Sequence, residues 1–333
     1  MRLSIIGAVA GLACGAAGAA FAAAPGYHVL DKIPGPDGGW DYARVDAKTD
    51  RVYVTRGSAV EAIDLATRKV TTGLVPGGRE HIALPVNGGA EILVTDGGAN
   101  TAIFADAVTG APAATVPTGK GPDSATLDPH SGLVLVMDHA GGEVTLVDPK
   151  TRKVVGTIPV GGTLEEGAVD GAGHAFIAVE DKHEIAAVDI AGRKVTARWP
   201  LPGCDGPSGL AYDNHDKLLI AACDGASAVI STADGKVQAM LPTGKGADGA
   251  VYDPARRLAF VPAGRDGTLS VIGFAKGHAS IVETVPTQKG ARTIALDERS
   301  GRLYLPSATY VVQTTSGRPT PVAGTFQVIV VGK

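Results

Sequence analysis

The chain has 333 residues, of which 44% are hydrophobic and 19% are charged, so it can bury a full core, and its length alone permits one large domain or two. Its 46 glycines and 21 prolines favour many tight turns between short strands over long helices. The formal net charge of -4 argues against a dedicated nucleic-acid binder, which normally presents a basic face to phosphate.

The chain begins with a segment typical of a secretory signal peptide. Met1 and Arg2 give a short positive start, followed by the apolar run LSIIGAVAGLACGAAGAAFA and a small-residue cleavage site near residues 22–24. We therefore expect residues 1–23 to be a signal peptide, residues 24–333 to form a single domain, and the protein to be exported to the periplasm. No other stretch approaches about 18 unbroken apolar residues, so we expect no membrane span in the mature protein.

A four-strand unit recurs seven times from residue 35 onward, at a spacing of about 42 residues. The third unit shows it clearly, because SATLD, LVLVMD, EVTLVD and KVVGTIPV are short apolar runs bounded by turn residues. A sheet of four short strands needs cover on both faces, and radial stacking supplies it. The sequence predicts an all-β, seven-bladed propeller with four antiparallel strands per blade.

One position, at the end of the first strand of each unit, carries aspartate in every unit but the second, which has Pro85. The turns after these strands are polar and repetitive, so we interpret them as a solvated structural rim. The aspartates are Asp46, Asp128, Asp170, Asp213, Asp253 and Asp297.

The two ends of the chain are expected to pair. The last unit ends in GTFQVIVVGK, which reads as a third strand, and the chain stops before a fourth. Residues 27–35, YHVLDKIPG, resemble the outer-strand segments of other units. We predict that this N-terminal strand closes the last blade, which removes an exposed sheet edge.

The repeat resembles that of the YVTN-repeat, or YncE-like, family of seven-bladed propellers. The resemblance is carried by Tyr53, Val54 and Thr55 in RVYVTR, by Val94 and Thr95 in ILVTDGG, and by blade endings such as DPKTRKVVGTIPVG. It covers nearly all of the mature chain. Related propellers include binding proteins, heavy chains of amine dehydrogenases, lactonases and an antibiotic-ring lyase, so the resemblance implies a fold and no single activity.

Removal of the leader takes away Cys14 and leaves Cys204 and Cys223. In an oxidising compartment we expect these two to form a disulfide, closing a loop of about 19 residues and stabilising the fold by roughly 3 kcal/mol. Two free thiols or a metal-binding pair are the alternatives, although the chain has no CxxC spacing beside them.

One face of the predicted propeller carries variable loops, and a ligand site is expected there. These loops lead into the inner strands or join the second strand to the third, and the long final loop, residues 307–324, is either a partner contact or a lid. The candidate ligand-binding residues on this face are Trp40, Asp41, Arg56, Glu80, His81, Asp123, Glu165, Asp248, Arg265 and Arg292.

Several candidates have two interpretations. Asp123 and Asp248, in matching GKGPD and GKGAD loops, either form turns or contact a ligand. Trp40 either stacks a ligand or packs against the axis. Arg292 and Arg265 either neutralise nearby carboxylates or bind a substrate carboxylate or phosphate.

The adjacent Glu165 and Glu166 are expected to point in opposite directions, so that only one faces the channel. His139 and His183 lie on the variable face with Glu180, where a metal or acid–base role is open to them.

No sharp catalytic motif appears in the sequence. The leading hypothesis is a monomeric periplasmic propeller that binds a small ligand, an ion or a partner protein, with no reaction assigned. The alternative is a metal-assisted lyase or lactone hydrolase. In that case His81, His139 and Glu80 are the catalytic candidates, a divalent ion is the cofactor, and its candidate ligands are Glu80, His81, Asp123 and Glu165.

Overall fold

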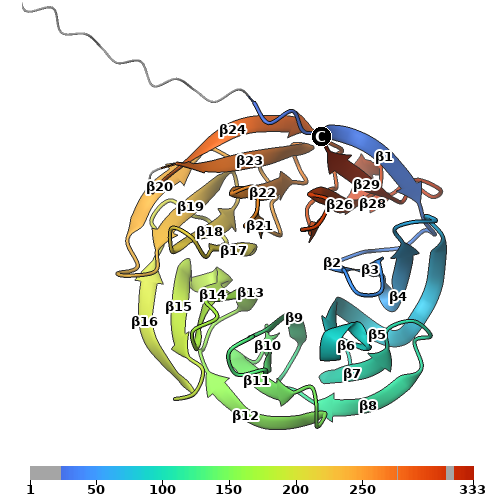
Figure 1. The fold of residues 1–333 in the computed structure, drawn as a ribbon, viewed down its shortest axis with the longest axis horizontal. Helices are drawn as coiled ribbons and strands as arrows, with labels where there is room; N and C mark the ends of the chain where they lie inside the picture. Colours follow the sequence, from blue (N-terminus) through green and yellow to red (C-terminus); the bar gives the residue numbers. More distant parts are fainter. Residues whose placement is uncertain (1–23, 276, 313–318) are drawn as a thin grey trace, which may run out of the picture.

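The computed structural model describes residues 24–275, 277–312 and 319–333. Its sheets stand radially around a central axis (Figure 1), so the protein is an all-β propeller. The expected signal peptide lies outside the described residues. Among the residues that the structure covers, no helix is both long and apolar enough to cross a membrane.

The strands fall into four classes by distance from the axis. The innermost strands are β2 (Ala43–Asp46), β9 (Pro122–Leu127), β13 (Leu164–Val169), β17 (Leu210–Asp213), β21 (Val251–Asp253) and β25 (Ala295–Asp297). The second strands are β3 (Arg51–Thr55), β6 (Glu91–Asp96), β10 (Val134–Asp138), β14 (His174–Val179), β18 (Leu218–Cys223), β22 (Leu258–Ala263) and β26 (Arg302–Ser307).

The third strands are β4 (Gly57–Asp64), β7 (Thr101–Asp106), β11 (Glu143–Asp148), β15 (Glu184–Asp189), β19 (Ala226–Ser231), β23 (Thr268–Ala275) and β29 (Gln327–Gly332). The outer strands are β1 (His28–Pro34), β8 (Pro112–Pro117), β12 (Lys153–Pro159), β16 (Lys194–Pro200), β20 (Val237–Leu241) and β24 (His278–Pro286). Strand β5 (Val70–Val86) spans two classes. A small hairpin, β27 (Tyr310–Val312) with β28 (Pro319–Pro321), and the 3-10 turns Asn87–Gly89 and Glu180–Lys182 complete the described elements.

The prediction of seven separate four-stranded blades was wrong. Within the described residues the strands form five four-stranded blades and one seven-stranded sheet, ordered β2-β3-β4-β5-β6-β7-β8, besides the small hairpin. The cause is β5, in which the outer strand of the first repeat unit runs without a break into the inner strand of the second. Gly77 and Gly78, at the boundary between the units, have no positive φ, and Glu80 pairs with both Gly57 of β4 and Asp96 of β6.

The predicted pairing of the chain ends is confirmed. Strand β1 runs antiparallel to β29, from the pair His28 and Gly332 to the pair Pro34 and Gln327. Figure 1 shows the blue β1 lying against the red β29. The last blade is therefore built from both ends of the chain, in the order β1-β29-β26-β25.

The core lies between neighbouring sheets. Met137 of β10, for example, packs in one buried cluster with Ile177 of the next blade. At the rim, the repeated aspartates bond to the turns that follow them: the Asp128 carboxylate accepts from the Ser131 hydroxyl at 2.7 Å, and Asp46 accepts from the Thr49 hydroxyl at 2.8 Å. This is the structural role expected of the repetitive rim.

The predicted disulfide is present. Cys204, in the loop leading into β17, is bonded to Cys223 at the end of β18. The bond ties a variable loop to a buried strand of the same blade.

Truncating β1 on its buried side should weaken ring closure. Ile33 is 5% exposed and packs with Val328 of β29, in its own blade, and with Val52 of β3, in the neighbouring sheet. We predict that Ile33→Ala lowers the free energy of unfolding by about 2–4 kcal/mol. Leu30→Ala on the same strand, where the side chain is 38% exposed, should cost less than about 1 kcal/mol. Urea unfolding of both variants is the measurement, and equal losses would contradict the closure role.

Candidate functional site

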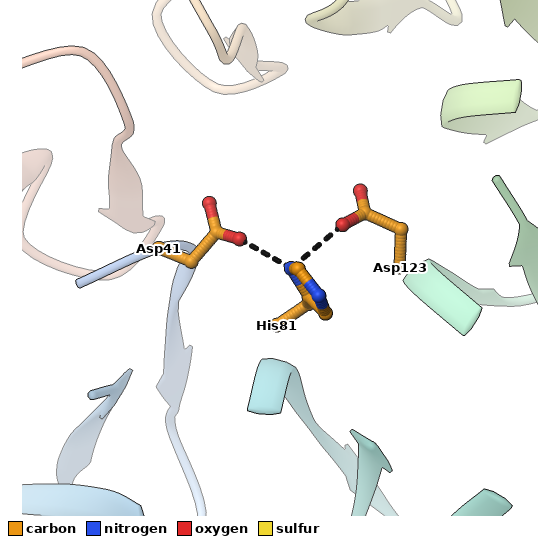
Figure 2. A group of neighbouring side chains, drawn as sticks. All are labelled: Asp41, His81 and Asp123. Atoms are coloured by element: carbon orange, nitrogen blue, oxygen red, sulfur yellow. Dashed lines mark hydrogen bonds and ion pairs between the residues drawn. The ribbon is translucent and has the colours of Figure 1, made fainter. Parts of the chain in front are cut away.

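Three predicted site residues from separate repeat units meet near the axis. Asp41 lies just before β2, His81 lies within β5, and Asp123 lies in β9. The His81 Nδ1 atom is 2.6 Å from Asp41 Oδ2 and 2.8 Å from Asp123 Oδ1. Figure 2 shows the two carboxylates approaching the imidazole from opposite sides. The three side chains are 13–20% exposed, so the cluster is largely desolvated but reachable.

Threonine hydroxyls hold the backbone of this cluster in place. Thr55 donates to the His81 carbonyl at 2.7 Å, Thr95 to the Asp123 carbonyl at 2.7 Å, and Thr293 to the Asp41 carbonyl at 2.8 Å. Each bond joins one repeat unit to its neighbour. This role is not evident from the sequence, although Thr55 and Thr95 belong to the RVYVTR and ILVTDGG segments that carry the family resemblance.

The cluster is held together by charge. Burial of the His81 ring disfavours its charged form, but the hydrogen bonds and negative charges of Asp123 and Asp41 outweigh that effect and raise the pKa of His81 to about 10. His81 is therefore an imidazolium at neutral pH, and its Nδ1 proton is shared between two carboxylates.

Arg292 extends the cluster by two more charges. Its Nε donates to Asp248 at 2.7 Å, and its terminal nitrogen donates to the Trp40 carbonyl at 3.0 Å and lies 3.4 Å from Asp41. Burial raises the pKa of Asp248 to about 7, although the Arg292 charge opposes the shift. The row Asp123, His81, Asp41, Arg292 and Asp248 thus alternates between acid and base.

A second group lies beside the first. His139 Nδ1 is 3.1 Å from both the Glu165 carboxylate and the Leu164 carbonyl, and a ligand atom of Glu180 lies within 4.8 Å of those of His139 and Glu165. The hydrogen bond to Glu165 raises the pKa of His139. Burial raises the pKa of the Glu165 carboxyl, and the nearby Asp123 adds to that shift.

The other predicted residues lie elsewhere. Trp40 is 6% exposed and packs against Phe326 and Tyr310, with ring centroids 5.5 and 5.7 Å away, so its ring is part of the core. Arg56 pairs with Glu61 at 2.8 Å and covers the ring of Phe326. It also donates to the carbonyls of Gly39 at 2.9 Å and Pro36 at 2.6 Å, and so anchors the segment before β2.

Arg265 is exposed and pairs with Asp224 at 3.1 Å. His183 is half exposed and accepts a bond from the Gly206 amide at 3.2 Å.

The four predicted metal ligands do not form one group. His81 and Asp123 come together, but Glu165 contacts His139. Glu80 lies beside Asp96, 1% exposed, and neither of its carboxylate oxygens has a hydrogen-bond partner among the described residues. Sequence spacing cannot separate these groups, because their members come from different repeat units.

Two cavities flank the clusters. One, of about 270 Å³, adjoins the second group and is lined by Glu180, Asp205, Ser208, Asp224, Asp248 and Arg265. The other, of about 310 Å³, is lined by inner strands and contains Glu166. Glu166 accepts a bond from Arg44 at 2.8 Å and another from the Leu210 amide at 3.1 Å. The adjacent Glu165 and Glu166 therefore have different partners, and the link to Arg44 had not been predicted.

The comparisons agree with the fold. The chain is similar to a chain of the Kuenenia stuttgartiensis hydrazine synthase, with 15% identity, a TM-score of 0.68, and coverage of 89% of this chain and 97% of that one. It is also similar to a chain in a crystal structure of a mitotic checkpoint complex, with 11% identity, a TM-score of 0.71, and coverage of 99% and 98%. No protein-family model and no curated protein matches the sequence. At these identities the likeness defines a β-propeller and nothing finer.

Glu80 should make folding stability depend on pH. Burial raises the pKa of Glu80 to about 7, so the folded protein binds this proton more tightly than the unfolded chain. Its contribution to stability is complete below about pH 4.5 and is lost as the pH rises through about 7. We predict that Glu80→Gln changes the free energy of unfolding more favourably at pH 8 than at pH 5, with a difference of about 1–3 kcal/mol between the two pH values. Denaturant unfolding at both pH values measures this, and a pH-independent effect would contradict it.

Proposed function

We propose that this protein is an exported propeller that binds a divalent metal ion, or a small ligand through that ion, with Asp41, His81 and Asp123. The observation that carries the proposal is their convergence: one imidazole nitrogen and two carboxylate oxygens lie within 4.8 Å of one another. Zn²⁺ takes such nitrogen and oxygen ligands at about 2.0–2.2 Å, and three protein ligands leave a coordination position for water or a small molecule.

The surroundings support this proposal. The Thr55, Thr95 and Thr293 hydroxyls fix the three backbones, so a bound ion would need only small side-chain shifts. Arg292 holds Asp41 from the side away from His81. In the state described here the His81 proton bridges the two carboxylates, and metal binding would displace that proton.

Two finer proposals rest on the sequence. The positive start, apolar run and small-residue cleavage site of residues 1–23 support export to the periplasm. The RVYVTR and ILVTDGG segments support membership of the YVTN-repeat, YncE-like family, in which Thr55 and Thr95 would be the residues that join neighbouring units.

A protein partner is the second candidate. One structural neighbour is a chain from a mitotic checkpoint complex, and propellers are commonly protein-binding scaffolds.

A metal-assisted lyase or lactone hydrolase would use the same ion as the main proposal, through its open coordination position.

Zinc titration tests the proposal. The exported protein and its variants are titrated with Zn²⁺ by calorimetry. We predict that His81→Ala and Asp123→Asn each weaken the binding of one equivalent of Zn²⁺ by at least about tenfold. His215→Ala is the matched control, because His215 lies on the rim and bonds to Asp216. Thermal unfolding checks that each variant is folded. If folded His81→Ala and Asp123→Asn bind Zn²⁺ as the unsubstituted protein does, the proposed site is wrong.

A further inference from the structure

We infer that His139, Glu165 and Glu180 form a second divalent-cation site beside the first, so that the propeller binds two ions. The inference shares its ion chemistry with the proposed function but rests on different residues. One ligand atom from each of the three side chains lies within 4.8 Å of the other two. The set is one imidazole and two carboxylates, the same donor types as in the first cluster.

Backbone hydrogen bonds hold the three residues together. The Leu164 amide donates to the His139 carbonyl at 3.3 Å, and the Glu180 amide donates to the Thr163 carbonyl at 2.9 Å. The Ser124 hydroxyl donates to the Glu165 carbonyl at 2.9 Å, as the threonines do in the first cluster. Because these bonds link β9, β13 and the ends of β10 and β14, the donor set is built into the blades rather than carried by one loop.

The exposure of the ligands suits a small cation. Glu165 is 8% exposed, whereas the His139 side chain is 38% exposed and Glu180 is exposed. An ion would thus be bound on its buried side by the Glu165 carboxylate, and it would enter from solvent past His139 and Glu180. A cavity of about 270 Å³ borders the group on the side of Glu180, which also lines that cavity.

The local charge also favours a cation. Glu165 and Glu180 face one histidine, and in the neighbouring row three carboxylates, those of Asp41, Asp123 and Asp248, face only two basic groups, His81 and Arg292. Arg292 is bonded to Asp248 and Asp41, so its charge is already balanced.

Cobalt titration distinguishes the two sites. Co²⁺ is added to the exported protein, and visible absorption, together with the metal content after gel filtration, counts the equivalents bound. We expect two equivalents in the unsubstituted protein and one in His139→Ala, and Glu180→Gln should weaken one equivalent by at least about tenfold. His183→Ala is the matched control, because His183 is a half-exposed histidine close in sequence to Glu180 but outside the group.

Each result decides between the sites. If the protein binds a single equivalent that His81→Ala removes and folded His139→Ala retains, the second site is wrong and the proposed function stands. If a single equivalent is lost on His139→Ala and retained by His81→Ala, the second site stands and the first is wrong. Two equivalents bound with unchanged affinity by folded His139→Ala would overturn the inference.

Discussion

The pairing of β1 with β29 is the constraint on which the rest of the structure depends. Each sheet has two apolar faces, and only a closed ring gives every sheet a neighbour on both sides. Closure joins the first described strand of the chain to its last, so the blade that carries Thr293 is held against the unit that carries Asp41. Without the pairing of β1 with β29, the ring would be open, and the sheet faces and strand edges on both sides of the opening would be exposed to water.

Closure also explains how the candidate site is assembled. The inner strands approach the axis from different directions, and hydroxyl groups join those around the site: Thr55, Thr95 and Thr293 each donate to a carbonyl in the neighbouring unit. The same bonds that fix the ring therefore fix the Asp41, His81 and Asp123 side chains. The alternation of acid and base around the axis lets these charges lie together in a poorly solvated place, because each one has an opposite partner.

Much of the fold was predictable, because it depends on patterns that repeat along the chain. The short apolar runs indicated strands, residues 27–35 were recognised as the closing strand, and Cys204 and Cys223 were paired. The separation into seven blades failed at β5, because Gly77 and Gly78 stay within one strand that passes from the first repeat unit into the second. The site was only partly predictable. His81 and Asp123 were both candidate metal ligands and lie together, whereas the other two candidates, Glu80 and Glu165, lie in other groups, because distances between units depend on the three-dimensional packing and not on sequence spacing.

The most direct test of the account is to locate a bound ion in a crystal of the exported protein grown with Zn²⁺, using anomalous diffraction at the zinc edge. The account predicts a peak on the axis between Asp41, His81 and Asp123, at about 2.0–2.2 Å from each ligand atom. A well-ordered crystal in which these three side chains remain hydrogen-bonded to one another, with zinc found only elsewhere on the surface, would contradict it.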